Sequence, residues 1–412
     1  MPKSPASLKT FALATAAALL ALLASPAPAG RAQVQDEEAH QRPRRVSPTP
    51  TPQSAPKAPA QKGSAGEEVD EDDVVRIETQ LVSVPAVVTD RAGRPLTGLK
   101  AADFQIFEDG RPQKIANFST TEAPFEVALL LDTSGSTRED VGLIRAAARA
   151  FVEALRPGDR VAILAFNTKK EGSDSLATVE LKSPLTDDRD LLQEAVESIG
   201  ASNGTPFYDS LSKVAKEVFR DRPTEQTRGR RALVALTDGV DSTSESGFEE
   251  ARESLKRAGV VSYFVLVNTE DYVEDRLMQD CEDDGALRLS NTQLQRYRRV
   301  IAPGAAAEDF SNFCRMGQFE RMHASRTLYQ MARAEMSSLA RESGGKTFAA
   351  ADLRDARRAF RQVAEDIGTQ YSIGYYSTNT ARDGSFRKIN VQVRTVKDAQ
   401  VRAREGYQAP RS

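Results

Sequence analysis

Three short polar segments carry side-chain oxygens that could together hold a metal ion. They are residues 132–136 (DTSGS), 203–205 (NGT) and 237–239 (TDG). Carboxylate and hydroxyl oxygens suit a hard cation such as Mg²⁺, which accepts few protein ligands and keeps waters or a partner's oxygen in its octahedral shell. We therefore expect a site for Mg²⁺, with Mn²⁺ or Ca²⁺ as alternatives. Its ligands would be Asp132, Ser134, Ser136, Thr205 and Asp238.

The elements around these segments predict a doubly wound α/β domain over residues 124–370. Short runs that are apolar on both faces indicate strands of a buried, mostly parallel sheet with helices on both of its faces. These runs are residues 127–131, 161–166, 232–236 and 260–267. Helical periodicity alternates with them at 139–155, 189–199, 206–219, 248–258, 328–341 and 352–367. Ligands of such sheets gather in the crevice beyond the carboxyl ends of the strands, where we expect the site side chains to lie and Asp132 to be exposed.

The three segments resemble the metal-ion-dependent adhesion site of the von Willebrand factor type A (VWA) family. The family pattern Asp-x-Ser-x-Ser matches residues 132–136, its second-loop Thr matches Thr205, and its third-loop Asp matches Asp238. The resemblance implies that Ser134, Ser136 and Thr205 contact the metal directly or in one of its two states. It also implies that Asp132 and Asp238 act largely through waters.

This set of ligands predicts a binding function. Neutral hydroxyls with water-relayed acids leave a divalent cation under-neutralised, so the cation can accept one more anionic oxygen. The leading hypothesis is a non-enzymatic adhesion-type module that binds a carboxylate of a partner protein. The alternatives are a structural envelope protein whose metal only rigidifies the three loops, and a metal-assisted hydrolase.

Other catalytic mechanisms have little support in the residues. A serine triad needs a histidine, and the two histidines are His40 and His323. An aspartyl-phosphate phosphatase would need a second acid at the position of Ser134. Residues 344–347 (GGKT) resemble the end of a phosphate-binding loop, but Ala340 stands where that motif needs Gly. We therefore expect those glycines to end a helix before the next strand.

The two flanks of the α/β domain predict a small β-sandwich-like domain that is split in sequence. Residues 74–123 and 371–412 each carry strand patterns, but neither has enough strands to be stable alone, so we expect them to pair. Two separate flanking hairpins are the alternative. The flanks resemble a group of bacterial exported VWA-related proteins at 98–104 (GLKAADF), 108–110 (EDG), 374–376 (GYY) and 386–389 (FRKI). That resemblance implies an architecture and no function.

The N-terminus predicts export. Lys3 and Lys9 precede about 14 weakly polar residues and a small-residue segment, which is the order of a secretory signal peptide over 1–29. This stretch is shorter than the roughly 20 residues that cross a bilayer, so we expect no stable membrane insertion after cleavage and a secreted or periplasmic protein. Residues 30–73 are rich in Pro and acids and indicate a disordered linker. Without the two lysines of the signal, the net charge is 54 minus 59, or −5, which argues against a nucleic-acid partner.

One long charged connection, residues 269–326, interrupts the α/β pattern and carries both cysteines. Because it leaves the carboxyl end of the strand at 260–267, we expect it to overhang the metal site. In an oxidising compartment Cys281 and Cys314 would form a disulfide, with two free thiols as the alternative. A zinc site of Cys281, Cys314 and His323 is a third reading, but its spacing fits no common zinc motif.

Overall fold

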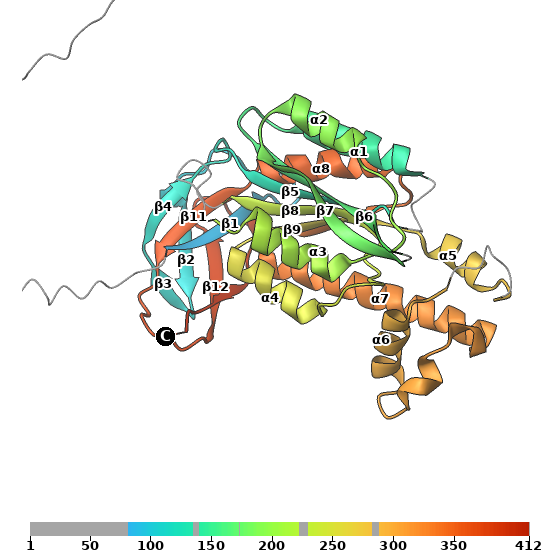
Figure 1. Cartoon of the computed structure of the whole chain (residues 1–412). Helices are drawn as coiled ribbons and strands as arrows, with labels where there is room; N and C mark the ends of the chain where they lie inside the picture. Colours follow the sequence, from blue (N-terminus) through green and yellow to red (C-terminus); the bar gives the residue numbers. More distant parts are fainter. Residues whose placement is uncertain (1–80, 135–139, 173, 222–229, 282–287, 412) are drawn as a thin grey trace, which may run out of the picture. The chain divides into compact units, whose positions relative to one another are not determined.

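The computed structural model describes residues 81–134, 140–172, 174–221, 230–281 and 288–411. The described residues form one compact unit (Figure 1). The predicted signal peptide (1–29), the predicted linker (30–73) and the predicted metal ligand Ser136 lie outside the described residues.

A six-stranded sheet forms the centre of the α/β domain, in the order β10-β9-β8-β5-β6-β7. Its strands are β5 (Glu126–Leu131), β6 (Arg160–Glu171), β7 (Asp174–Thr186), β8 (Arg231–Thr237), β9 (Val261–Val267) and β10 (Lys346–Ala350). The first five in this order are parallel, whereas β7 runs antiparallel to β6 at the edge. Every residue of β5 and β8 is buried, as their continuous apolar runs predict. The predicted fold class is confirmed, although β7 was not predicted, because its partly exposed residues form no continuous apolar run.

Helices cover both faces of this sheet (Figure 1). One face carries α1 (Val141–Ala154), α2 (Arg189–Glu197) and α8 (Ala356–Gly368), whose apolar sides share a core with the sheet. The other carries α3 (Phe207–Lys213), α4 (Phe248–Ala258) and α7 (Gln318–Ser343), which share a second core. The helix predicted over 206–219 is divided, since α3 continues as a π-helical turn over Val214–Val218. As predicted, α7 ends at a glycine before a strand, with Gly344 in the left-handed region at φ 84°.

The long connection 269–326 is largely helical. It contains α5 (Glu270–Leu277), α6 (Asn291–Ile301) and two short 3₁₀ turns, Ala307–Phe310 and Phe313–Arg315. Its last part belongs to α7, which begins at Gln318 rather than at the predicted Leu328. This boundary was wrong because the side chains buried in the first turns of α7 are polar or small, namely Arg321, Ala324 and Ser325, and give no apolar periodicity. We refer below to residues 269–317 as the insertion.

Two antiparallel sheets lie beside the α/β domain, and each combines strands from both flanks. Their orders are β13-β1-β11-β4 and β14-β12-β2-β3. The strands are β1 (Leu81–Thr89), β2 (Phe104–Glu108), β3 (Arg111–Gln113), β4 (Ile115–Ser119), β11 (Tyr371–Tyr376), β12 (Phe386–Val393), β13 (Gln400–Ala403) and β14 (Gly406–Gln408). Strand β1 pairs with β11 on one side and β13 on the other, and β12 pairs with β2. The two flanks therefore pair with each other and share one apolar core.

Candidate metal centre

The first site segment begins at the carboxyl end of β5. The Asp132 amide donates to the Leu236 carbonyl oxygen at 3.0 Å, so Asp132 continues the ladder between β5 and β8. Its carboxylate accepts from the Ser134 amide at 3.0 Å and from the Thr237 hydroxyl at 2.6 Å. The described partners of Asp132 thus come from the first and third segments, and they fix the direction in which the carboxylate points.

The Asp132 side chain lies deeper than expected. Only 1% of the residue is exposed, so the prediction that Asp132 lies exposed in a crevice was wrong. Asp238 is also buried, with 6% of the residue exposed. Burial raises the pKa of Asp132, and the negative charge of Asp238 raises it further. Hydrogen bonds from Ser134 and Thr237 lower the pKa in part, and the resulting value is about 7. A buried acid beside a second carboxylate is an arrangement that a bound cation relieves.

Hydrogen bonds of Ser202 and Thr205 connect the second loop to the first segment and to Ser242, just beyond the third. The Ser202 amide donates to the Thr133 carbonyl oxygen at 2.8 Å. The Thr205 amide donates to the Ser242 hydroxyl at 2.8 Å, and the Ser242 amide donates to the Thr205 carbonyl oxygen at 3.0 Å. A β-carbon at Gly204 would lie 2.8 Å from a methyl carbon of Thr243, so this close approach of the loops requires glycine. Thr205 is thereby placed at the N-terminal end of α3.

The third segment places Asp238 against residues that the sequence did not single out. One carboxylate oxygen accepts from the Val240 amide at 3.0 Å. The other accepts from the Thr269 hydroxyl at 2.7 Å and lies 3.4 Å from the Tyr329 hydroxyl. The Thr269 and Tyr329 hydroxyls are also 2.7 Å apart. Thr269 lies just beyond the carboxyl end of β9, two residues after Val267, which is a signal that could have been used. Nothing in the sequence marks Tyr329 on α7.

A pocket of about 140 Å³ opens beside these segments. Ser134, Thr205 and Asp238 line it, and Asp132 lies behind them through its bonds to Ser134 and Thr237. The insertion lines it too, with Val273, Arg288, Leu289 and Gln293, so its expected position over the site is confirmed. Within the described ranges no group of three or more His, Cys, Asp or Glu side chains is placed to hold a metal. The donor set is instead two carboxylates with hydroxyls, which fits a hard cation such as Mg²⁺.

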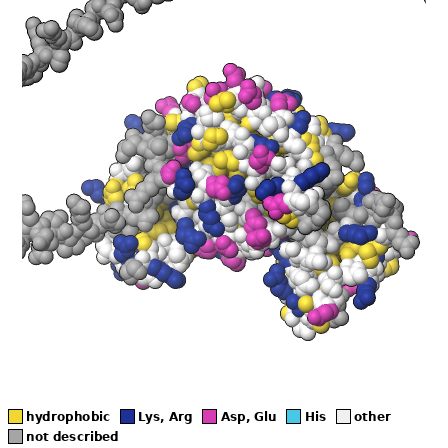
Figure 2. Space-filling view, viewed as in Figure 1, with side chains coloured by type: hydrophobic (Ala, Val, Ile, Leu, Met, Phe, Trp, Pro, Cys, Tyr) yellow, Lys and Arg dark blue, Asp and Glu magenta, His cyan; other side chains and the backbone are white. Residues whose placement is uncertain are grey.

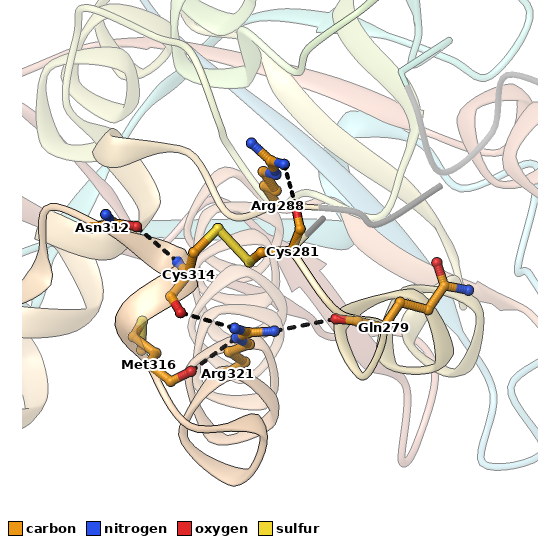
Figure 3. Close-up of a disulfide and its surroundings, with 7 residues drawn as sticks. All are labelled: Gln279, Cys281, Arg288, Asn312, Cys314, Met316 and Arg321. Atoms are coloured by element: carbon orange, nitrogen blue, oxygen red, sulfur yellow. Dashed lines mark hydrogen bonds between the residues drawn. A yellow bond between two sulfur atoms is a disulfide. The ribbon is translucent and has the colours of Figure 1, made fainter. Parts of the chain in front are cut away.

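The two cysteines of this region are bonded to each other. The Cys281–Cys314 disulfide joins residues with Cα atoms 5.7 Å apart, as predicted (Figure 3). Neither sulfur is then a thiolate, so the zinc reading with Cys281, Cys314 and His323 is excluded. Beside the disulfide, the buried Arg321 guanidinium donates to the carbonyl oxygens of Cys314, Met316 and Gln279. These bonds fasten both ends of the insertion to the first turn of α7.

The architecture and the site together define a doubly wound α/β domain with a polar centre at the carboxyl edge of its sheet. Residues 126–293 match the family model described as the von Willebrand factor type A domain, so the chain contains a domain of this family. This assignment indicates a protein-interaction module. A search of curated proteins gave no match.

Solved structures show likenesses that concern the fold alone. Proximal thread matrix protein 1 from the mussel byssus matches over 59% of this chain and 48% of its own, with 10% identity and a TM-score of 0.37. The chain therefore spans about half the length of that protein. The von Willebrand factor type A structure from Catenulispora acidiphila matches over 75% of this chain and 74% of its own, with 13% identity and a TM-score of 0.36.

No helix within the described residues is both long enough and apolar enough to cross a bilayer. Figure 2 shows acidic and basic side chains mixed over the face in view, without one continuous basic surface.

Proposed function

We propose that this chain is an exported, non-enzymatic protein, secreted or periplasmic, that binds a protein partner through a divalent cation. The cation would be Mg²⁺, with Mn²⁺ or Ca²⁺ as alternatives, and the partner would present an acidic side chain. The observation that carries this proposal is the convergence of Ser134, Thr205 and Asp238 on one pocket, with Asp132 bonded behind them. Ser136, the fifth residue of the motif, lies outside the described residues.

The residues of this site have different roles in holding a cation. Ser134 and Thr205 offer neutral hydroxyl oxygens at the pocket, while Asp238 supplies charge there and Asp132 supplies charge from behind. A bound Mg²⁺ would supply a strong acceptor for one more anionic oxygen. The titratable residues that line the pocket are Asp238, Arg288 and Tyr329, and this set contains no matched general acid and base. The site therefore favours binding over catalysis, and the net charge favours a protein partner over nucleic acid.

The first test is the effect of metal on stability. Mg²⁺ at a hundred times its dissociation constant should raise the free energy of unfolding of the full chain by about 2.7 kcal/mol. Asp238→Ala should lose this gain, because it removes the carboxylate that lines the pocket. Asp187→Ala, at an exposed residue outside the site, is the matched control and should keep the gain. An equal Mg²⁺ effect in Asp238→Ala would show that the metal, if bound, is held elsewhere.

The second test separates a binding module from a purely structural metal site. The immobilised chain should retain a protein from an extract of the exported fraction in Mg²⁺ and release it in chelator, and Asp238→Ala should retain none. Mg²⁺ stabilisation without any Mg²⁺-dependent retention would support the structural alternative. Hydrolysis of phosphate or carboxylic esters by the pure protein would support the alternative of a metal-assisted hydrolase.

A further inference from the structure

The insertion contributes part of the lining of this pocket, in addition to the three metal-site segments. Val273 on α5 and Leu289 are buried apolar residues of this lining, and the buried Leu328 on α7 lines the pocket as well. Arg288 adds the one basic side chain among the lining residues. The pocket therefore combines an acidic, hydroxyl-rich side with an apolar and basic side.

The size of the pocket limits what can enter it. Its volume of about 140 Å³ is well below the roughly 300 to 1,000 Å³ of pockets for small molecules. It is close to the roughly 150 Å³ of an engineered cavity that holds one benzene. The pocket thus accommodates a single side chain, and the apolar residues would contact its methylene groups.

The Arg288 guanidinium can bind a carboxylate of a ligand. Its guanidinium donates one hydrogen bond, to the Cys281 carbonyl oxygen at 2.6 Å (Figure 3). Within the described ranges it forms no ion pair with a carboxylate. A guanidinium has five N–H donors, so donors remain for a ligand. Charge-assisted bonds from arginine to a carboxylate are among the stronger hydrogen bonds in proteins.

The surroundings of Arg288 hold it near the metal-site segments. Its acceptor, Cys281, is half-buried and belongs to the disulfide, which closes the insertion. On its other side, Ser290 caps α6 and donates through its hydroxyl to the Ser242 carbonyl oxygen at 2.7 Å. Ser242 is also the residue that pairs with the Thr205 backbone. Arg288 thus lies between two anchored residues, Cys281 and Ser290. The entropy cost of ordering this part of the chain on binding is therefore small.

We propose that Arg288 is a specificity-determining residue of this site, which binds the acidic side chain of the partner while Val273, Leu289 and Leu328 contact its methylene groups. This inference rests on the proposed function, because it concerns the same pocket. It assigns the selection of the partner to the insertion and leaves the holding of the cation to the three loops.

The test uses the full chain and two small probes in Mg²⁺, N-acetylglutamate methylamide and its neutral glutamine analogue. Binding is followed by saturation-transfer NMR of the probe. The unmodified chain should bind the glutamate probe and bind the glutamine probe at least about tenfold more weakly. Arg288→Ala should weaken binding of the glutamate probe by about tenfold or more, and Arg288→Lys should weaken it less. Arg299→Ala, at an exposed arginine of α6, is the matched control and should bind as the unmodified chain does.

Stability in Mg²⁺ distinguishes failure of this inference from failure of the proposed function. Arg288→Ala should keep the full Mg²⁺-induced gain, which also shows that the variant is folded. If that gain is kept and the glutamate probe binds Arg288→Ala as tightly as the unmodified chain, the role of Arg288 is refuted and the metal site stands. Failure of the unmodified chain to prefer glutamate over glutamine also refutes it. If Mg²⁺ does not raise the free energy of unfolding of the unmodified chain, the proposed function itself is refuted.

Discussion

The two ends of strand β5 each carry a buried carboxylate, and the two are neutralised in different ways. At the amino end, Glu126 is 2% exposed and accepts from Arg160 at 3.1 Å and from Arg231 at 3.1 Å. Just beyond the carboxyl end, Asp132 is 1% exposed, and its described partners are an amide and a hydroxyl, with the Asp238 charge nearby. The protein's own arginines balance the first carboxylate, whereas hydroxyls and a second acid surround the other.

The difference separates a structural carboxylate from one arranged for a ligand. Arg231 also donates to the Phe219 and Asp221 carbonyl oxygens, so Glu126 belongs to a network that closes the amino end of the sheet. A buried ion pair of this kind is complete without anything from outside. The insertion, with its disulfide, covers the carboxyl end of the sheet. The pocket there is lined by the Asp238 carboxylate, whose negative charge can bind a cation. Burial alone does not reveal which acid has a function, but the partners do.

The largest effect should come from removing the disulfide that closes the carboxyl end. The double variant Cys281→Ser/Cys314→Ser frees a loop with a sequence separation of 33 residues and should lower the free energy of unfolding by about 3 to 4 kcal/mol in the chain-entropy model. Urea denaturation measures this loss. Because the Mg²⁺ ligands come from the three loops, the variant should still gain stability from Mg²⁺. A loss below about 1 kcal/mol would show that the insertion is held by its other contacts.

A slightly smaller effect should follow Glu126→Gln at the amino end. The substitution keeps the shape of the side chain but leaves the buried Arg231, 6% exposed, without its countercharge. We expect a loss of about 3 kcal/mol, at the lower end of the range for breaking a buried pair. The Mg²⁺-induced gain should be unchanged. Glu365→Ala, at an exposed acid on α8, serves as the control and should cost almost nothing.

The smallest effect on the metal-free protein should follow Asp132→Asn, the same neutralisation at the other end of β5. It removes a charge next to the Asp238 charge, so we expect a change in the free energy of unfolding of less than about 1 kcal/mol without metal. In saturating Mg²⁺ this variant should gain almost nothing, unlike the unmodified chain. Equal costs for Glu126→Gln and Asp132→Asn would remove the distinction drawn between the two ends.

The elements that could be predicted from the sequence are those whose patterns lie within a short segment of the chain. The buried strands of the central sheet and most of the helices could be predicted because continuous apolar runs and 3.6-residue periodicity are properties of short segments. The pairing of the two flanks could be inferred because neither has enough strands alone. Strand β7 and the first turns of α7 could not, because their buried residues are mixed with polar or small ones.

The candidate site divides in the same way. The residue types and their positions after strands determined by themselves that Asp132, Ser134 and Asp238 would meet, because the carboxyl ends of parallel strands share one edge. Thr205 was placed with them as part of a turn before a helix and by the family pattern. Only the tertiary structure decided how deeply Asp132 lies, that Tyr329 contacts Asp238, and that Arg288 lines the pocket. These facts depend on how a 26-residue helix and a disulfide-closed insertion pack over the edge of the sheet. Such packing joins residues far apart in the chain through contacts that no local pattern records.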